Sequence, residues 1–320
     1  CLWSAIAVAL IAVLVSGLRD RLSFQNINLG YSTTFSYAES DTYTVGDAAL
    51  PENAPVQEIA VRWVAGSVDI RMYDGDTIRF SESASRALNE HELMRYRYKD
   101  GTLTLQFCKS AGGLSLFTNM PEKSLELWIP ARLALRKLSV DAVSSDVTLR
   151  GQGAHIRGLS LESVSGGLTT EAVVADELDL DTVSGSIRAD GAFGKIDAES
   201  VSGSLSFALP ATPDVLDAES ISGSIHVAVS GKDGFTADFD TVSGSLQCAF
   251  ADSLQKKKAV YGDGTAAFRF ETVSGSVTIE RNERLAVPAT KPSAAAPHTP
   301  ANAPAPSATK DPVQSGGRNF

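Results

Sequence analysis

The sequence predicts an all-β protein built around a single-stranded parallel β-solenoid, with coils of about 20 residues. Three observations predict this fold: a short motif recurs at a near-constant spacing, apolar and polar residues alternate on both sides of it, and nearly every copy contains a Ser-Gly pair. A unit of this length is too short to be a domain, but stacked units can share one continuous core.

The motif reads acid, Ser or Thr, Val or Ile, Ser, Gly, Ser, aliphatic. Six clear copies follow one degenerate copy, and successive third residues are 21, 19, 18, 20, 21 and 31 positions apart. These marker residues are Val143, Val164, Val183, Val201, Ile221, Val242 and Val273. The long last interval contains a run of three lysines, 256–258, and we expect it to form a loop at one edge of the stack.

The residues around each motif alternate between apolar and polar, as in Leu178-x-Leu180 before one copy and Leu205-x-Phe207 after another. A period of two predicts strands with one buried face. Glycine accepts positive φ without steric cost, so the motif glycines are predicted to turn the chain between two strands. They are Gly166, Gly185, Gly203, Gly223, Gly244 and Gly275. Identical positions of stacked coils should then lie about 4.8 Å apart.

Residues 139–285 therefore form the predicted solenoid, and residues 56–138 a less regular β-rich part that caps one end of it. Within that part, Asp100-Gly101 predicts a tight hairpin turn, and residues 84–93 a short helix or loop. Residues 19–55 are expected to be a juxtamembrane segment and linker. Residues 286–320 are rich in Pro and Ala and are expected to form a disordered tail.

Residues 1–18 carry no charge. As a helix they would reach about 27 Å, close to a bilayer core of about 30 Å, so we expect a transmembrane anchor. A cleaved signal peptide is the alternative, because Val15-Ser16-Gly17 resembles a cleavage site. Arg19 and Arg21 alone would place the following domain in the cytoplasm. We expect the opposite orientation, on the hypothesis that residues upstream of Cys1 carry further positive charge.

Composition excludes several classes of function. A formal net charge of -10 is unfavourable for binding nucleic acid. Cys1, Cys108 and Cys248 have neither disulfide nor zinc spacing, and the latter two are expected to be buried thiols. The four histidines lie far apart, and no phosphate loop or dinucleotide fingerprint occurs. The sequence thus predicts no catalytic residue, no cofactor and no small-molecule substrate.

The repeated acid is the strongest candidate for a binding residue. Alternation points it outward and the next residue, Ser or Thr, inward, where stacked hydroxyls can bond along the ladder. Two carboxylates 4.8 Å apart in water repel by about 0.9 kcal/mol, which favours a solvated charged face or a bound cation such as Ca²⁺. The candidate cation row is Asp141, Glu162, Asp181, Glu199, Glu219, Asp240 and Glu271.

These patterns resemble the bacterial DUF4097 family of adhesin-like β-strand repeat proteins over roughly residues 56–280. The resemblance rests on the VSGS repeats and on IAVRWVAGSVDIRMYDGDTIRFSE, DGTLTLQF and SLELWIPARLALRKLSV. It implies one N-terminal transmembrane segment, an extracytoplasmic β-helical domain and no catalytic residues. It also implies an association with envelope stress regulation.

We therefore expect a non-enzymatic module of the cell envelope that acts as a scaffold, an adhesin or a stress-associated binding protein. Residues 1–18 would hold it as a single-pass protein in the bacterial plasma membrane, with an envelope polymer or another membrane protein as its partner. The alternatives are a self-assembling filament and a carbohydrate-active β-helix enzyme. The latter would need acids and bases clustered on a few coils, whereas the acids here are spread evenly.

Overall fold

The fold is seen in a computed structural model, which describes residues 34–35, 42–52, 54–109, 111–112, 121–230 and 233–282. These residues form strands and no α-helix, so none of them belongs to a helix long and apolar enough to cross a bilayer. The predicted anchor, 1–18, and the predicted tail, 286–320, lie outside the described residues.

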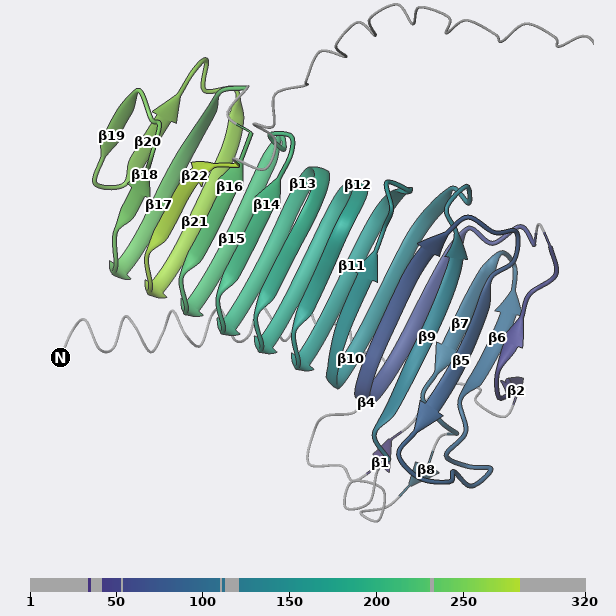
Figure 1. The fold of residues 1–320 in the computed structure, drawn as a ribbon. Coiled ribbons are helices and arrows are strands. Elements are labelled where there is room, and N and C mark those ends of the chain that lie inside the picture. The colour runs from purple at the N-terminus through teal and green to yellow at the C-terminus, as the bar shows by residue number, and fades with distance from the viewer. Residues whose placement is uncertain are drawn as a thin grey trace, which may run out of the picture. The chain divides into compact units, whose positions relative to one another are not determined.

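The centre of the molecule is a stack of parallel strands in register (Figure 1). Each coil has two arms. The segment that ends in the motif is called the motif arm here, and the segment that follows the Ser-Gly pair is called the return arm. The strands of this region are β10 (Leu135–Arg150), β11 (His155–Ser165), β12 (Leu168–Ser184), β13 (Ile187–Ser202), β14 (Leu205–Leu209), β15 (Val215–Ser222) and β16 (Ile225–Val229).

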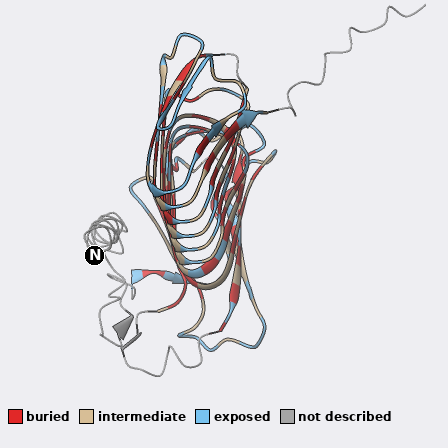
Figure 2. Ribbon diagram, turned by 90° about the vertical axis from the view of Figure 1, so that its left-hand side faces the viewer, coloured by how far each residue is buried: buried red, intermediate tan, exposed pale blue. Residues whose placement is uncertain are grey.

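The long strand β12 shows how a coil is built. Leu168 to Thr170 form its return arm and pair with the start of β13, whereas Val174 to Ser184 form the next motif arm and pair with the rest of β13. A register shift between Thr170 and Val173 separates the two arms. Viewed along the stack, such coils are nested one behind another (Figure 2).

The shared interior confirms the predicted alternation. Leu178 and Leu180 of β12 are buried, as are Leu205 and Phe207 of β14, while Asp179 between the first two is exposed. At about 25 cal/mol per Å², a fully buried Leu or Phe stabilises the fold by roughly 1.5–3 kcal/mol, so this repeated column is the main source of stability.

The last rungs depart from the predicted order. The strands here are β17 (Phe235–Ser243), β18 (Leu246–Cys248), β19 (Ser253–Gln255), β20 (Lys258–Tyr261), β21 (Ala266–Ser274) and β22 (Val277–Arg281). The rung of β21 and β22, last in sequence, lies between that of β15 and β16 and that of β17 and β18. Glu219 therefore pairs with Glu271, and Glu271 with Asp240.

The 31-residue interval explains this order. The segment that was expected to be a loop forms the hairpin of β19 and β20, and β20 runs antiparallel to β17 from Phe235↔Tyr261 to Asp238↔Lys258. The chain therefore turns back after β20, and β21 fills the slot between β15 and the other edge of β17. Phe235 and Phe268 stack in this slot with ring centroids 4.8 Å apart and planes 10° apart.

The N-terminal part continues the same stack. Its strands are β2 (Thr44–Val45), β3 (Ala48–Ala49), β4 (Glu58–Tyr73), β5 (Arg79–Ala84), β6 (Arg95–Lys99), β7 (Thr102–Gln106) and β9 (Lys123–Pro130). Strand β4 pairs in parallel with β10 on one edge and with β7 and β9 on the other. Antiparallel strands then cover this end, β6 on β7 and β5 on β9, as the predicted cap requires.

Three local features complete this part. The hairpin at Asp100-Gly101 is confirmed, with φ of 51° and 78°. Residues 85–94 form turns and no helix after β5 ends at Ala84. The short strands β2 and β3 pair with β6 and β5, and β1 (Thr34–Phe35) pairs with β8 (Ala111–Gly112).

Candidate functional sites: the corner, the outer faces and the N-terminal cap

The Ser-Gly corner is built by close approach of successive rungs. A Cβ atom on Gly185 would lie 2.0 Å from the carbonyl oxygen of Gly166, and one on Gly223 would lie 2.0 Å from that of Gly203. Only Gly166 and Gly203 of the motif glycines have positive φ, at 150° and 155°. The prediction of positive φ is thus wrong for the other four, where glycine is needed because a side chain would strike the neighbouring backbone.

The inward position before the marker residue is buried, as predicted, in every rung except the terminal one, where Thr241 is half-buried. Ser163, Thr182, Ser200 and Ser220 are 0% exposed and Thr272 is 5% exposed. The expected hydroxyl ladder is only partly present, because Ser163 donates to the Ser145 carbonyl at 3.3 Å while the hydroxyls of Thr182, Ser200 and Thr272 have no hydrogen-bond partner among the described residues. The hydroxyls instead fill the space inside the corner, where the Thr182 oxygen lies 3.2 Å from the Cβ position of Gly185.

The seven repeated acids, called the acid row here, line up on the outer side of the motif arm. Their order in space is Asp141, Glu162, Asp181, Glu199, Glu219, Glu271 and Asp240. Glu162 and Glu199 are 6% exposed and Asp181 is 2% exposed, so the expected solvated face is wrong at these three positions. Each of them lies between the acids of the two adjoining rungs. Asp240, on the terminal rung, is exposed.

Crowding and burial change the acidity of this row. Burial, together with the charges of Asp179, Glu199, Glu162 and Asp197, raises the pKa of Asp181 to about 8. Burial also raises the pKa of Asp141 to about 6, although Arg62 opposes the shift. Negative charge is therefore costly here, and a proton or another cation relieves it.

We expect Asp181→Asn to stabilise the protein at pH 8 and to have little effect at pH 4. The folded state holds the Asp181 proton up to about pH 8, whereas the unfolded chain releases it near pH 3.9, so this carboxyl's contribution to stability falls as pH rises between these values. The gain at pH 8 should be roughly 1–3 kcal/mol in urea-unfolding free energy. The exposed Asp74→Asn is the matched control, and equal effects of the two variants would refute the assignment.

A row of aliphatic side chains, the valine row, runs beside the acid row. In spatial order it contains Val143, Val164, Val183, Val201, Ile221, Val273 and Val242. Each follows an inward residue, Ala142 before Val143 and Ser or Thr before the others, so alternation places it on the outer side. Most members are half-buried, Ile221 is 8% exposed, and Val242 on the terminal rung is 43% exposed. The sequence revealed these residues as markers of the repeat but not as a surface.

Near the N-terminal end, the outer side of the return arm carries arginines that contact a tryptophan ring and an aspartate. Arg71 and Arg79 lie over the ring of Trp128, with guanidinium carbons 5.0 and 4.7 Å from its centroid. Asp69 pairs with Arg71 at 2.9 Å and with Arg150 of the next rung at 2.8 Å. The Arg71 side chain holds the pKa of Asp69 below its usual range, with Arg150 adding to the effect.

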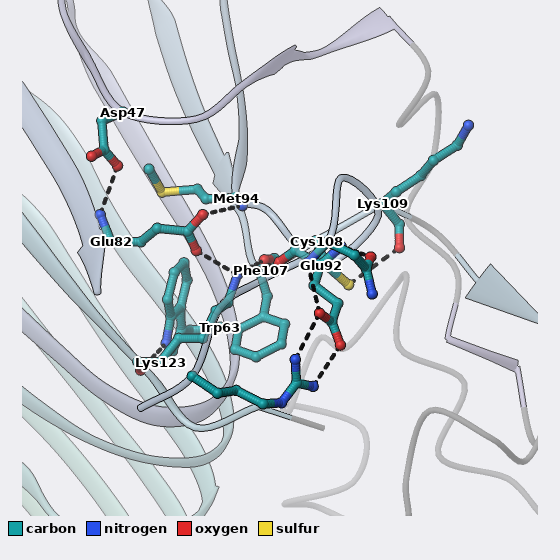
Figure 3. Close-up of polar contacts among 11 residues, drawn as sticks. Asp47, Trp63, Glu82, Glu92, Met94, Phe107, Cys108, Lys109 and Lys123 are labelled. Atoms are coloured by element: carbon teal, nitrogen blue, oxygen red, sulfur yellow. Dashed lines mark hydrogen bonds and ion pairs between the residues drawn. The ribbon is translucent and has the colours of Figure 1, made fainter. Parts of the chain in front are cut away.

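A buried ion pair lies in the N-terminal cap (Figure 3). Lys123 starts β9 opposite Gly66, and its side chain is 0% exposed. Its Nζ donates to Glu82 Oε2 at 2.6 Å, to the Glu92 carbonyl at 2.7 Å and to the Phe107 carbonyl. The ammonium also lies 4.1 Å from the ring centroid of Phe107. Nothing in the alternation pattern distinguished this lysine, because its partners come from β5, from the turn at Glu92 and from the end of β7, which the pattern does not bring together.

The groups around this ion pair are strongly shifted. Burial lowers the pKa of Lys123, although Glu82 opposes the shift. Arg86 binds Glu92 through two hydrogen bonds, at 2.9 and 2.6 Å, and lowers the pKa of Glu92 to about 2. Cys108 is the buried thiol that the sequence predicts, and burial raises its pKa to about 11. Cys248 on the short terminal strand is only half-buried, contrary to expectation.

The remaining candidates do not gather into a site. In the described part of the chain, no group of three or more His, Cys, Asp or Glu side chains is arranged to hold a metal ion. His155 pairs with Asp176 at 2.8 Å and His226 with Glu280 at 3.1 Å, on different rungs. Lys257 and Lys258 pair with Asp240 and Asp238 at 2.6 and 3.1 Å, so two lysines of the run hold the terminal hairpin to β17.

Three solved structures resemble the fold. A candidate cell adhesion protein from Clostridium sporogenes is 12% identical, with 75% of this chain and 99% of that chain covered and a TM-score of 0.37. A candidate adhesin from Bacteroides fragilis is 13% identical, with 74% and 97% covered and a TM-score of 0.43. One from Parabacteroides distasonis is 14% identical, with 74% and 97% covered and a TM-score of 0.37. No curated protein matches the chain.

The family model described as Toastrack DUF4097 matches residues 49–280. The matched region runs from β3 through the antiparallel cap and the stacked rungs to β22, so it includes most of the described strands. It also contains all seven copies of the motif. The chain belongs to the Toastrack DUF4097 family.

Proposed function

We propose that this chain is a non-enzymatic binding module of the bacterial cell envelope, which residues 1–18 hold at the plasma membrane with the β-solenoid outside the cytoplasm. The solenoid would present its outer faces to an envelope polymer or to another membrane protein. The adhesin-like character of the family supports a binding role.

One observation carries the proposal: the acid and valine rows run side by side along the outer side of seven rungs, and most members of the valine row stay partly accessible although Glu162, Asp181 and Glu199 are buried. At about 4.8 Å per rung, this surface is about 29 Å long. Repeats that contact only their neighbours form stiff extended surfaces of this kind, which suit elongated partners. The chain places the same two residue types there in every rung, although the core needs neither a buried acid nor an outward aliphatic residue.

Localisation is tested in intact cells of the source bacterium. We expect the full chain in the membrane fraction, with the solenoid degraded when protease is added to cells stripped of their wall. A soluble protein, or one degraded only after lysis, would contradict the proposed anchoring and topology.

The binding surface is tested by crosslinking in the same cells. We expect the triple variant Val164→Ser, Val183→Ser and Val201→Ser to lose most of the crosslinked partner, because it removes three adjacent members of the valine row. The triple variant Thr148→Ser, Thr169→Ser and Thr278→Ser is the control, since it removes three methyl groups from the outer side of the return arm. Equal crosslinking of the two variants would contradict the assigned surface.

A further inference from the structure

The corner hydrogen bonds form a regular series along the stack. The amide of each motif glycine donates to a serine carbonyl of the next rung, from Gly166 to Ser184 at 3.1 Å through to Gly275 to Ser243 at 3.1 Å. A second series two residues later ends with Val277 donating to the Ser245 carbonyl at 2.9 Å. Each rung therefore presents two corner donors to the rung that follows it in space.

The terminal rung of β17 and β18 leaves this series open. No described residue accepts a hydrogen bond from the amide of Gly244 or of Leu246, the next donors in the two series. The covering strand β20 pairs only with Phe235 to Asp238 of β17, and the Phe239 amide bonds to the Lys257 carbonyl at 2.7 Å. Beyond that point, no described strand pairs with the outer edge of residues 240–248.

Exposed apolar side chains lie at the same end. Val242, on the open edge, is 43% exposed, and Leu254 of the covering hairpin is 51% exposed. Val45 is the one other large apolar side chain of comparable exposure among the described residues, and it lies on β2 in the N-terminal cap. The end of the stack thus combines unused backbone donors with unburied aliphatic surface.

We propose that this open half-edge, residues 240–248, is a docking site for an extended strand of another polypeptide, which adds in parallel as one further rung. Parallel addition continues the ladder that every internal rung already forms, so the strand gains two corner hydrogen bonds and covers Val242. Main-chain bonds of this type give affinity, and side-chain pockets give specificity.

The edge also dictates the sequence of its partner. A Cβ atom on Gly275 would lie 2.0 Å from the Gly223 carbonyl oxygen, and one on Gly244 would strike the Gly275 carbonyl oxygen. By the same geometry, the residue added opposite Gly244 meets the Gly244 carbonyl and must be glycine. An acid four residues before that glycine would lie opposite Asp240, beside Lys257, whose Nζ is 2.6 Å from Asp240 Oδ1. The preferred partner is an acid-x-aliphatic-Ser-Gly-Ser-aliphatic segment, the pattern of this chain's own repeat.

Binding of a labelled peptide to the full chain in detergent tests this site. The probe has the sequence of residues 217–228, and its matched control carries alanine at the position of Gly223. We expect the glycine peptide to bind at least about tenfold more tightly by fluorescence anisotropy, because only glycine avoids the Gly244 carbonyl. It should also slow hydrogen exchange at the Gly244 and Leu246 amides. Equal binding of the two peptides, or unchanged exchange at both amides, would overturn the proposal.

Variants of the protein locate the site independently. Val242→Lys should lower the affinity for the glycine peptide by about tenfold, while Val45→Lys at the other end of the stack should leave that affinity unchanged. Equal loss in the two variants would place the peptide elsewhere. This site lies at the end of the stack and goes beyond the proposed function, whose crosslinking and localisation tests do not depend on it.

Discussion

Lys123→Met is expected to lower the free energy of unfolding by about 3–5 kcal/mol, the typical cost of removing one partner of a buried ion pair. The substitution keeps a long side chain between the rings of Trp63 and Phe107 but removes the ammonium. Glu82, whose side chain is 5% exposed, would then be a buried carboxylate without its cation. Two backbone carbonyls would also lose their donor. Urea unfolding followed by tryptophan fluorescence measures the loss.

Two further variants separate this ion pair from a general effect of losing a cation. Arg86→Met removes an ion pair with Glu92 whose arginine is 45% exposed, and it should lower stability much less than Lys123→Met does, because solvent screens an exposed pair. Adding Glu82→Gln to Lys123→Met removes the uncompensated charge and should restore part of the lost stability. A Lys123→Met protein as stable as the Arg86→Met protein would contradict the buried ion pair.

Gly185→Ala is expected to disrupt the stack at its centre and to cost more than about 3 kcal/mol. The new methyl group would lie 2.0 Å from the Gly166 carbonyl oxygen and 2.7 Å from its carbonyl carbon. Because both atoms belong to the backbone of a rung held in register on each side, the clash cannot be relieved by a side-chain rotation. The measurement is the change in melting temperature and in the circular dichroism of the β-structure.

The corner of the preceding rung provides a control. Gly167 occupies the position where the following copies have Ser, and a Cβ atom there would lie 3.5 Å from Asp146 Oδ1 and 3.6 Å from the Ser186 carbonyl oxygen. Those distances are ordinary contacts, so Gly167→Ala should be neutral or stabilise by up to about 1 kcal/mol through the unfolded state. If the two alanine variants were equally stable, close approach at the corner would not be the reason for the regular spacing of glycine along the chain.

The fold was predictable where the sequence pattern recurs at a regular interval, because each repeat then packs against the next in the same way. Alternation around Leu178 and Leu180 identifies the buried face, and the spacing of the markers identifies the rungs. The place of β21 between β15 and β17 could not be predicted, because it depends on the β19–β20 hairpin reversing the chain. A spacing of 31 residues fits a loop and a hairpin equally well.

The candidate sites were less predictable than the fold. The acid row was found from its spacing, but the raised pKa of Asp181 depends on its burial and on the charges of neighbouring acids, which the spacing does not specify. The Lys123 ion pair joins β5, β9 and the turns between them, at sequence separations that no periodic pattern specifies. The roles of the corner glycines were misjudged because a turn suggests positive φ. What excludes a side chain at these positions is the backbone of the preceding rung.

The order of the last three rungs tests the central claim, that the motif copies stack in register with the final copy inserted. Cys248 is first replaced by serine so that its thiol cannot compete. One protein then carries Glu219→Cys and Glu271→Cys, and a second carries Glu219→Cys and Asp240→Cys. Adjacent parallel positions are about 4.8 Å apart, within reach of a disulfide, and positions two rungs apart are about 9.6 Å apart, beyond it. Mild oxidation should therefore crosslink the first protein and leave the second reduced. A disulfide in the second protein and none in the first would show that the copies stack in sequence order and would contradict this architecture.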